Sequence, residues 1–363
     1  MTLPDDLENR LRRSAVGAFP ELGSEAPVVI QRVHERPRST LIRCSVGAAP
    51  SGVRLIVKIP QVFARPASDR PRIVPDTPPL EKAGLEAATL GAIDRDLRRA
   101  PDPRFAAVSV IDVYEDIGAI VMTEASGAPL SGLVLRAVGR RTSGSATARL
   151  ATALGSAGAW LHRFQRLDLA TQRTPRFESR AEVVDMAREI AAYLAPRTTR
   201  PSAVGDVAER FSDAADELLP DVIPTGLHHG DFAIRNLLIS PDGIVTAIDA
   251  LGRWRMPIYD DLARMIVAIE TSRIQSSSFG LALRPAQLTT MGDAILAGYG
   301  ADEVDPAAVR VYAVLILLDR WAARSERRVG RAGRLASMSG TLSDRRYSLV
   351  ARRLLAPRFD RSP

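Results

Sequence analysis

The residues best suited to catalysis or cation binding lie in the stretch LHHGDFAIRNLLISPDGIVTAIDA, residues 227–250. Its two apolar runs, joined by the turn sequence Pro-Asp-Gly, predict a pair of short strands. A hard cation such as Mg²⁺ binds carboxylate and amide oxygens, so Asn236 and Asp249, brought together by the hairpin, would suit it. Asp231, in the loop before the hairpin, would then be free to act as a general base. Phosphoryl transfer needs this division of labour.

The neighbouring pair His228 and His229 offers a second interpretation, a metal site with histidine ligands. Zinc needs three or four N, S or O ligands, and the only other histidines are His34 and His162, in different local contexts. The single cysteine, Cys44, excludes an intrachain disulfide and a cysteine-based zinc site. We therefore expect hard-cation chemistry at 227–250, with Cys44 as a buried free thiol and His162 as a packing residue.

Lysine is rare in this chain, since only Lys58 and Lys82 among the 49 basic residues are lysine. A retained lysine can mark a place where a compact ammonium is needed and a planar guanidinium does not fit. Lys58 ends the apolar run VRLIVK, whereas Lys82 lies in the next segment of helical pattern. Composition alone leaves chance retention as an equal alternative.

The elements that must position these residues change in type along the chain. Residues 26–60 predict antiparallel strands, 61–80 a proline-rich loop, 81–97 a helix and 105–125 two further strands. From about residue 145 onward the pattern predicts amphipathic helices, at 147–167, 180–195, 203–219, 259–273, 285–300 and 305–328. We predict an α+β fold with two lobes: residues 1–125 as a small antiparallel β lobe with one helix, and residues 126–363 as a larger, mainly helical lobe.

Composition narrows the class of protein. The chain has 363 residues, 46% of them hydrophobic, and shows no apolar run long enough for a signal peptide or a membrane span, so we expect a cytoplasmic globular protein. The net charge of +7 is concentrated at 320–363, where twelve arginines face three acidic residues. Such a tail predicts a solvated basic face or a weak contact with an anionic membrane. A nucleic-acid partner is not expected.

At this point the motif resembles a known family. HGDFAIRN followed by IVTAIDA is similar to the catalytic loop and metal-binding aspartate of the aminoglycoside phosphotransferase and choline kinase superfamily, whose fold is that of protein kinases. The matching positions are His229, Gly230, Asp231, Asn236, Ile248 and Asp249, and later Pro257 and Asp261-Leu262-Ala263. The resemblance spans roughly residues 25–300. It implies that Asp231 is the catalytic base, that Asn236 and Asp249 bind Mg²⁺, and that His229 is architectural.

The resemblance extends to the first lobe. Lys58 stands where the family has the lysine that pairs with the nucleotide α- and β-phosphates, and Glu86 stands where its partner glutamate belongs, with Glu81 as the alternative if the helix register differs. The segment IVMTEASGAPL, residues 120–130, resembles the hinge that binds adenine. The resemblance places that contact at Thr123, Glu124 and Ala125.

One segment departs from the family pattern. RVHERPRSTLIRC, residues 32–44, lacks the glycine that often forms the phosphate loop. Its backbone amides could still approach phosphate with help from Ser39, Thr40 or Arg38, although Pro37 removes one donor. This departure leaves nucleotide affinity and the choice between ATP and GTP open.

Four neighbouring residues receive secondary interpretations. His228 is expected to have no chemical role, and Asp260 and Asp261 to cap the helix that starts there. Arg235 could reach the transferred phosphate, or it is a solvated or ion-paired structural residue. The basic, aromatic sequence GRWRMP at 252–257 favours a neutral or anionic acceptor over a polycation, although Arg253 and Arg255 could equally be ion-paired loop residues.

The sequence therefore predicts a small-molecule kinase that transfers the γ-phosphate of ATP or GTP to a hydroxyl of a sugar, amino alcohol or antibiotic-like acceptor. A protein kinase is disfavoured because the His-Arg-Asp, Asp-Phe-Gly and Ala-Pro-Glu motifs are absent from the sequence. The alternative from another class is a catalytically inactive kinase-like binding or scaffold module. The glycine-free segment favours that alternative, while intact Lys58, Asp231, Asn236 and Asp249 oppose it.

Overall fold

The computed structural model describes most of the chain, namely residues 6–36, 39–48, 52–60, 68–137, 144–169, 175–278, 280–300, 302–326 and 334–356. Its contacts divide the chain into two units. Unit 1 comprises Met1–Pro66, Asp76–Ala128 and Leu238–Gly252, and unit 2 comprises Ala67–Pro75, Pro129–Leu237 and Arg253–Pro363. Residues 238–252 thus group with unit 1, although the sequence reading assigns all of 126–363 to one domain. The predicted domain boundary itself stays a prediction.

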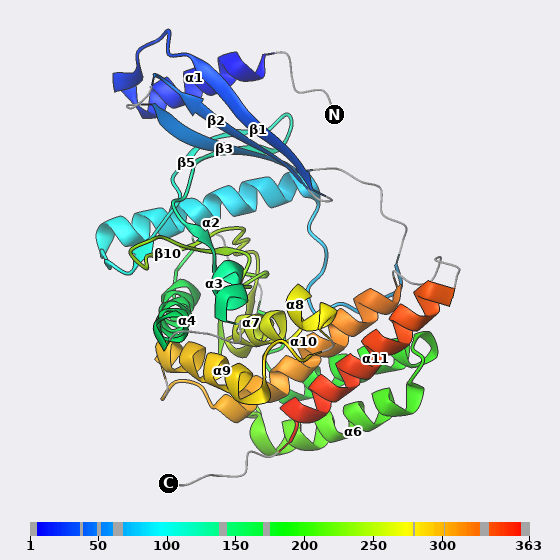
Figure 1. The fold of residues 1–363 in the computed structure, drawn as a ribbon. Coiled ribbons are helices and arrows are strands. Elements are labelled where there is room, and N and C mark those ends of the chain that lie inside the picture. The colour runs from blue at the N-terminus through cyan, green and yellow to red at the C-terminus, as the bar shows by residue number, and fades with distance from the viewer. Residues whose placement is uncertain are drawn as a thin grey trace. The chain divides into compact units, whose positions relative to one another are not determined.

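Unit 1 is built on a five-stranded antiparallel sheet with the order β1-β2-β3-β6-β5 (Figure 1). The strands are β1 (Val28–Arg36), β2 (Ser39–Val46), β3 (Val53–Pro60), β5 (Val110–Tyr114) and β6 (Ala119–Thr123). Successive side chains of a strand point to opposite faces. On β3 this alternation buries Leu55, Val57 and Ile59 in the core cluster of the unit and directs Lys58 to the other face.

Two helices pack on this sheet. α2 (Pro79–Arg99) contacts β3, β5 and β6, whereas α1 (Leu7–Ala18), followed by the short 3₁₀ helix η1 (Pro20–Leu22), contacts β1, β2 and β5. The sequence predicts only the first of these; α1 is an addition. The buried residues Leu7, Leu11 and Ala15, spaced by four, are the signal that could have located it.

A second, smaller sheet has the order β4-β10-β9-β7. Its strands are β4 (Phe105–Ala106), β7 (Ala128–Pro129), β9 (Leu237–Ile239) and β10 (Val245–Ala247), and the boundary between the units falls within β7 and at the start of β9. β10 pairs with β4 in parallel. The predicted turn joins β9 to β10, where Gly243 has a φ of 88° and donates its N–H to the Ser240 carbonyl at 3.0 Å.

Unit 2 is mainly helical (Figure 1). It also has a two-stranded ribbon of β8 (Thr225–Leu227) and β11 (Arg255–Pro257). Its helices are α3 (Leu130–Ala137), α4 (Gly144–Gln165), α5 (Arg180–Leu194), η2 (Ala195–Arg197), α6 (Pro201–Leu218), α7 (Tyr259–Glu270), α8 (Arg273–Ser277), α9 (Pro285–Gly300), α10 (Pro306–Glu326) and α11 (Arg334–Leu354). The predicted helix at 259–273 ends earlier, at Glu270. α10 is the core helix, because it packs against α5, α6, α7 and α11.

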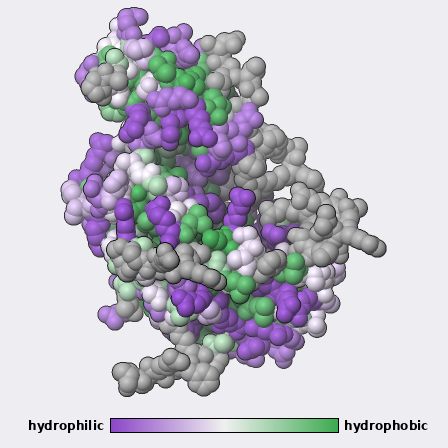
Figure 2. Space-filling view, in the orientation of Figure 1, coloured by the Kyte–Doolittle hydropathy of each residue, from purple (hydrophilic) through white to green (hydrophobic). Residues whose placement is uncertain are grey.

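The predicted α+β fold, with an antiparallel β part and a mainly helical part, is confirmed. Over the residues that the structure describes, no helix has both the length and the apolarity to cross a bilayer. Hydrophilic side chains cover much of the face drawn in Figure 2, with smaller apolar areas between them. Within the arginine-rich tail, residues 334–354 form α11, whose buried residues Asp344, Ser348 and Ala351 lie within unit 2. Its predicted membrane contact stays a prediction.

Candidate active site

In unit 1 the structure brings together three of the predicted residues, Lys58, Glu86 and Asp249. Lys58 lies on β3 and Glu86 on α2, and the Lys58 Nζ donates to both carboxylate oxygens of Glu86, at 2.6 and 2.7 Å. The same ammonium lies 2.5 Å from Oδ1 of Asp249, two residues beyond β10. Glu86 is 2% exposed and Asp249 30% exposed on their side chains. Glu86 rather than Glu81 is therefore the partner of the lysine.

In this cluster two carboxylates contact one ammonium. Burial alone would lower the pKa of Lys58, but the charges of Glu86 and Asp249 outweigh it and the pKa is raised. For Glu86, burial and the charge of Asp249 raise the pKa, although Lys58 opposes them. Asp249 also holds a left-handed backbone, with a φ of 63°, which is rare for a residue other than glycine. Strain of this kind concentrates at functional sites.

In unit 2 the loop after β8 carries Asp231 and Asn236. The side-chain amide of Asn236 donates from Nδ2 to the Asp231 carbonyl at 2.8 Å and to its carboxylate at 2.9 Å. Because the NH₂ group is committed to Asp231, the amide oxygen of Asn236 is the atom that could bind a cation. Asp231 itself is 45% exposed on its side chain and forms an ion pair with Arg235. Arg235 is thus ion-paired in this structure, one of the two interpretations left open by the sequence.

The start of this loop is held by two buried aspartates of α7. Asp261 accepts the backbone N–H groups of His229 at 2.8 Å and of Gly230 at 3.1 Å. Asp260 lies 2.7 Å from Nε2 of His228 and pairs with Arg264. The expectation that these aspartates cap α7 is wrong: their carboxylates turn to the loop, and no side-chain cap hydrogen bond forms at the start of the helix.

His228, Asp260 and Asp261 also lie close enough together to resemble a metal site. Their ligand atoms are already engaged, because Arg264 pairs with Asp260 and two loop N–H groups bind Asp261. Burial would raise the pKa of Asp260, but Arg264 and His228 outweigh it and lower the pKa to about 2. This cluster is a satisfied structural anchor. The sequence places Asp260 and Asp261 at a helix start, but it does not reveal which groups they bind after folding.

His229 is buried among aromatic rings. Its ring centroid lies 5.9 Å from that of Trp160, 5.7 Å from Phe164 and 5.5 Å from Phe232. The backbone N–H of Asp231 points to Nδ1 of His229 at 3.4 Å, so the ring lies directly behind the loop that carries Asp231. These contacts agree with an architectural role for His229, on which no ligand chemistry depends.

Beside the loop, Trp254 lies in a basic environment. Its carbonyl accepts the N–H of His228 at 2.9 Å, and the guanidinium carbons of Arg176 and Arg253 lie 5.3 and 5.0 Å from its ring centroid. Cation–π contacts of this length are favourable. Phe177, between Arg176 and Glu178, has a left-handed φ of 57° and is a second strained position in addition to Asp249.

The predicted hinge follows β6 in unit 1. Glu124 donates its backbone N–H to the Arg54 carbonyl at 2.9 Å, and its carboxylate pairs with Arg43 and Arg54. The backbone N–H of Thr123 donates to the Ser109 carbonyl at 3.0 Å. Of the three residues predicted to bind adenine, Thr123 and Glu124 therefore have their N–H groups committed within the sheet. For Ala125 the described residues supply no such bond.

The predicted phosphate contacts are only partly described. Ser39 and Thr40 begin β2, and Thr40 is buried, with 1% of its surface exposed. Pro37 and Arg38 lie outside the described residues. Ser39 and Thr40 lie near the tip of the β1–β2 hairpin, and their role in phosphate binding stays a prediction.

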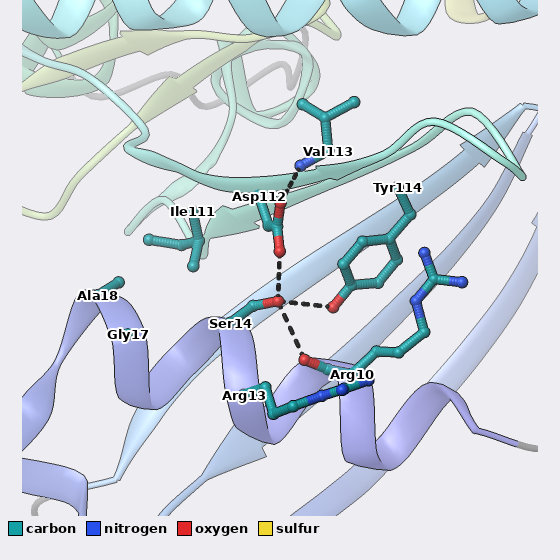
Figure 3. A pocket seen from close by; sticks show the side chains of 9 residues that line it. All are labelled: Arg10, Arg13, Ser14, Gly17, Ala18, Ile111, Asp112, Val113 and Tyr114. Atoms are coloured by element: carbon teal, nitrogen blue, oxygen red, sulfur yellow. Dashed lines mark hydrogen bonds between the residues drawn. The ribbon is translucent and has the colours of Figure 1, made fainter.

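A cavity of about 640 Å³ lies in unit 1 between α1 and β5, away from all of the predicted residues (Figure 3). Ser14 is central to its lining: its hydroxyl lies 2.6 Å from Asp112, 3.0 Å from the Tyr114 hydroxyl and 3.0 Å from the Arg10 carbonyl. Arg10 stacks on Tyr114 at 4.0 Å and pairs with Asp116. The polar groups satisfy one another, so this network ties α1 to the sheet.

Each half of the predicted site is thus organised within its own unit. Lys58, Glu86 and Asp249 meet in unit 1, and Asp231 and Asn236 meet in unit 2. The two carboxylates and one ammonium of unit 1 fit a divalent cation, because added positive charge would relieve the repulsion between Glu86 and Asp249. Sequence reasoning missed Asp260, Asp261 and Arg264 as the support of the Asp231 loop.

Solved structures share this fold at low sequence identity. An amicoumacin kinase in complex with AMP-PNP, Ca²⁺ and Ami matches with a TM-score of 0.54 and 13% identity, covering 97% of each chain. A thermostable mutant of an aminoglycoside phosphotransferase, in a ternary complex with AMP-PNP and hygromycin B, matches with a TM-score of 0.53, 13% identity and coverage of 96% and 98%. A macrolide 2'-phosphotransferase from Brachybacterium faecium gives 0.51, 15% identity and coverage of 93% and 98%.

These likenesses, all under 25% identity, establish the protein-kinase-like fold. No curated protein matches the sequence. A sequence profile described as the phosphotransferase enzyme family matches residues 49–310, which include Lys58, Glu86, Asp231, Asn236 and Asp249. The chain therefore belongs to the phosphotransferase enzyme family.

Proposed function

We propose that the protein is a kinase that transfers the γ-phosphate of ATP, or of GTP, to a hydroxyl group of a small molecule such as a sugar, an amino alcohol or an antibiotic-like compound. The observation that carries the proposal is the contact of Lys58 with both Glu86 and Asp249. A buried ammonium beside two carboxylates suits a triphosphate with its divalent cation. A simple structural ion pair would need one carboxylate, whereas the Lys58 ammonium contacts two.

In the proposed reaction each residue has one task. Lys58, oriented by Glu86, binds the α- and β-phosphates, while Asp249 and the amide oxygen of Asn236 are the ligands for Mg²⁺, which offsets charge on the transferred group. Asp231 accepts the proton of the acceptor hydroxyl. The Asp231–Arg235 pair must open for this step, which frees the guanidinium of Arg235 to face the phosphate. Adenine is expected to bind at the Ala125 N–H.

Nucleotide binding is tested by thermal shift with Mg²⁺ and ATP or GTP. A ligand at 100 times its dissociation constant stabilises the folded state by about 2.7 kcal/mol, which gives a clear rise in melting temperature. Lys58→Met should remove that rise. Lys82→Met, which changes the only other lysine, is the matched control and should retain it.

Catalysis is tested with Asp231→Asn in an assay of ADP or GDP release. Loss of a general base costs about 100-fold to 10,000-fold in turnover. The variant should keep the nucleotide-dependent thermal shift, because Asp231 does not hold the nucleotide. Substantial remaining turnover would show that the base has been assigned wrongly.

The second candidate is the inactive kinase-like binding module. Two observations favour it, the glycine-free segment 32–44 and the Arg235 guanidinium that pairs with the Asp231 carboxylate. The thermal-shift scan separates the two candidates, because a module without nucleotide function would be stabilised by neither ATP nor GTP.

A further inference from the structure

Arg320 of α10 stands out in unit 2 because its charge has no carboxylate partner among the described residues. Its guanidinium donates from NH1 to the Thr271 hydroxyl at 3.1 Å and from NH2 to the Arg264 carbonyl at 3.4 Å, and both acceptors are neutral. A guanidinium has five N–H donors, and two of them have acceptors among the described residues. Burying a cation without a counter-charge is costly, and such groups are found paired or at functional sites.

The neighbouring charges do not compensate Arg320. Arg264 pairs with Asp260, and Asp231 pairs with Arg235, so both nearby carboxylates have partners of their own. The pKa of Arg320 is lowered to about 10, first by burial and next by the charge of Arg264. Arg235 acts in the same direction, and only Asp231 and Tyr347 oppose it.

Arg320 is connected to the loop of the predicted base through α7. It donates to the carbonyl of Arg264 in α7 and to the hydroxyl of Thr271 at its C-cap. Arg264 pairs with Asp260, which lies 2.7 Å from Nε2 of His228 at the start of the loop that carries Asp231. Tyr347 of α11 stacks on Trp321, the residue after Arg320, with ring centroids 5.8 Å apart. Arg320 is partly exposed.

We propose that the acceptor is an anionic hydroxy compound whose carboxylate or phosphate group is bound by Arg320, while its hydroxyl is directed to Asp231. The fork of a guanidinium matches either anion through paired N–H groups. This inference rests on the proposed kinase function and narrows its substrate class. The basic surroundings of Trp254 agree with it, because they also disfavour a polycationic acceptor.

The test uses four acceptors on one scaffold: glucose, glucosamine, gluconate and glucose 6-phosphate. ADP release by the unaltered protein should give a kcat/KM at least about tenfold higher for gluconate or glucose 6-phosphate than for glucose, with glucosamine poorest. The two anions distinguish a carboxylate from a phosphate. A preference for glucose or glucosamine overturns the inference and leaves the kinase function standing.

Arg320→Gln should raise KM for the preferred anion about 30-fold or more and change the values for glucose less than about threefold. Arg324→Gln is the matched control, because Arg324 lies one turn further along α10, is exposed and, among the described residues, bonds to Ser343. Equal losses for charged and neutral acceptors overturn the inference. The comparison of acceptors on the unaltered protein remains decisive if Arg320→Gln does not fold.

If none of the four compounds is turned over, thermal shift decides. Gluconate or glucose 6-phosphate, added to the protein with Mg²⁺ and AMP-PNP, should raise the melting temperature where glucose does not, and Arg320→Gln should abolish the rise. Absence of such a shift overturns the inference. A protein that is not stabilised by nucleotide either fails the proposed function itself, which the nucleotide-only control reveals.

Discussion

The two charged clusters of this molecule differ in how well their charges are balanced. In unit 1, Glu86 and Asp249 share the single ammonium of Lys58, and the pKa of Glu86 is raised. In unit 2, Asp260 is held between Arg264 and His228, and its pKa is lowered to about 2. Glu86 and Asp260 are both buried, yet the pKa of Glu86 is raised and that of Asp260 is lowered. This difference, rather than burial or charge alone, is our reason for proposing a ligand site in unit 1 and a structural anchor in unit 2.

The largest effect on stability is expected from removing the charge of Asp260, which is held between Arg264 and His228. Asp260→Asn leaves Arg264 buried without its carboxylate, and breaking a buried ion pair in this way costs about 3–5 kcal/mol. Urea unfolding should show this loss in the free energy of unfolding. Asp213→Asn, an exposed aspartate of α6, is the control. A loss below about 1 kcal/mol would mean that the anchor contributes little to the stability of unit 2.

The corresponding substitution in the cluster of Lys58, Glu86 and Asp249 should lower activity without lowering stability. Asp249→Asn removes one of the two carboxylates that contact Lys58, so the melting temperature without ligand should stay the same or rise. Phosphate transfer should fall about 100-fold to 1,000-fold, because a proposed ligand of the Mg²⁺ that offsets charge on the transferred group is lost. Asp242→Asn, at the exposed β9–β10 turn, is the control. A clear drop in stability would show that Asp249 has a structural rather than a ligand-binding role.

Acid titration sharpens the same contrast. The folded-state pKa of Asp260 is about 2, below the value of about 3.9 for an unfolded aspartate. Its stabilising contribution is therefore fully present above pH 4 and is lost as the pH falls towards 2. The linked change is about 2 kcal/mol. Unfolding measured between pH 4 and pH 2 should show this slope in the unaltered protein and a smaller one in Asp260→Asn.

The contrast also explains what the sequence could predict. The sequence singles out Asp231, Asn236 and Asp249 because the motif and its hairpin are local in sequence. It singles out Lys58 because lysine is rare and because the residue stands where the family has its nucleotide-binding lysine; composition alone left chance retention open. The roles of Asp260 and Asp261 were misjudged because their partners, His228 and the N–H groups of His229 and Gly230, come from a segment some 30 residues earlier. A helix start explains an aspartate locally, and only tertiary contacts override that explanation.

Arg320 shows the same limit more strongly. In the sequence it is one of twelve arginines between 320 and 363, and nothing in the pattern separates it from the others. Its distinction is the lack of a carboxylate partner among the described residues, which depends on two other segments, the loop with Asp231 and the stretch of α7 and its C-cap that carries Arg264 and Thr271. The charge pattern could indicate that this region is basic, but not which cation is left unpaired.

The smallest effect on stability is expected at the hydrogen-bond network of Ser14, which is only partly buried and whose disruption removes no charge. Ser14→Ala removes the hydroxyl that links Asp112 and Tyr114 across α1 and β5 (Figure 3). A hydrogen bond of this kind contributes about 1 kcal/mol, and water in the adjoining cavity can replace part of it. Urea unfolding should therefore show a loss of about 1 kcal/mol, with nucleotide-dependent stabilisation unchanged. A loss as large as that of Asp260→Asn would mean that α1, which the sequence did not predict, is as tightly coupled to its unit as the anchor of the Asp231 loop is to unit 2.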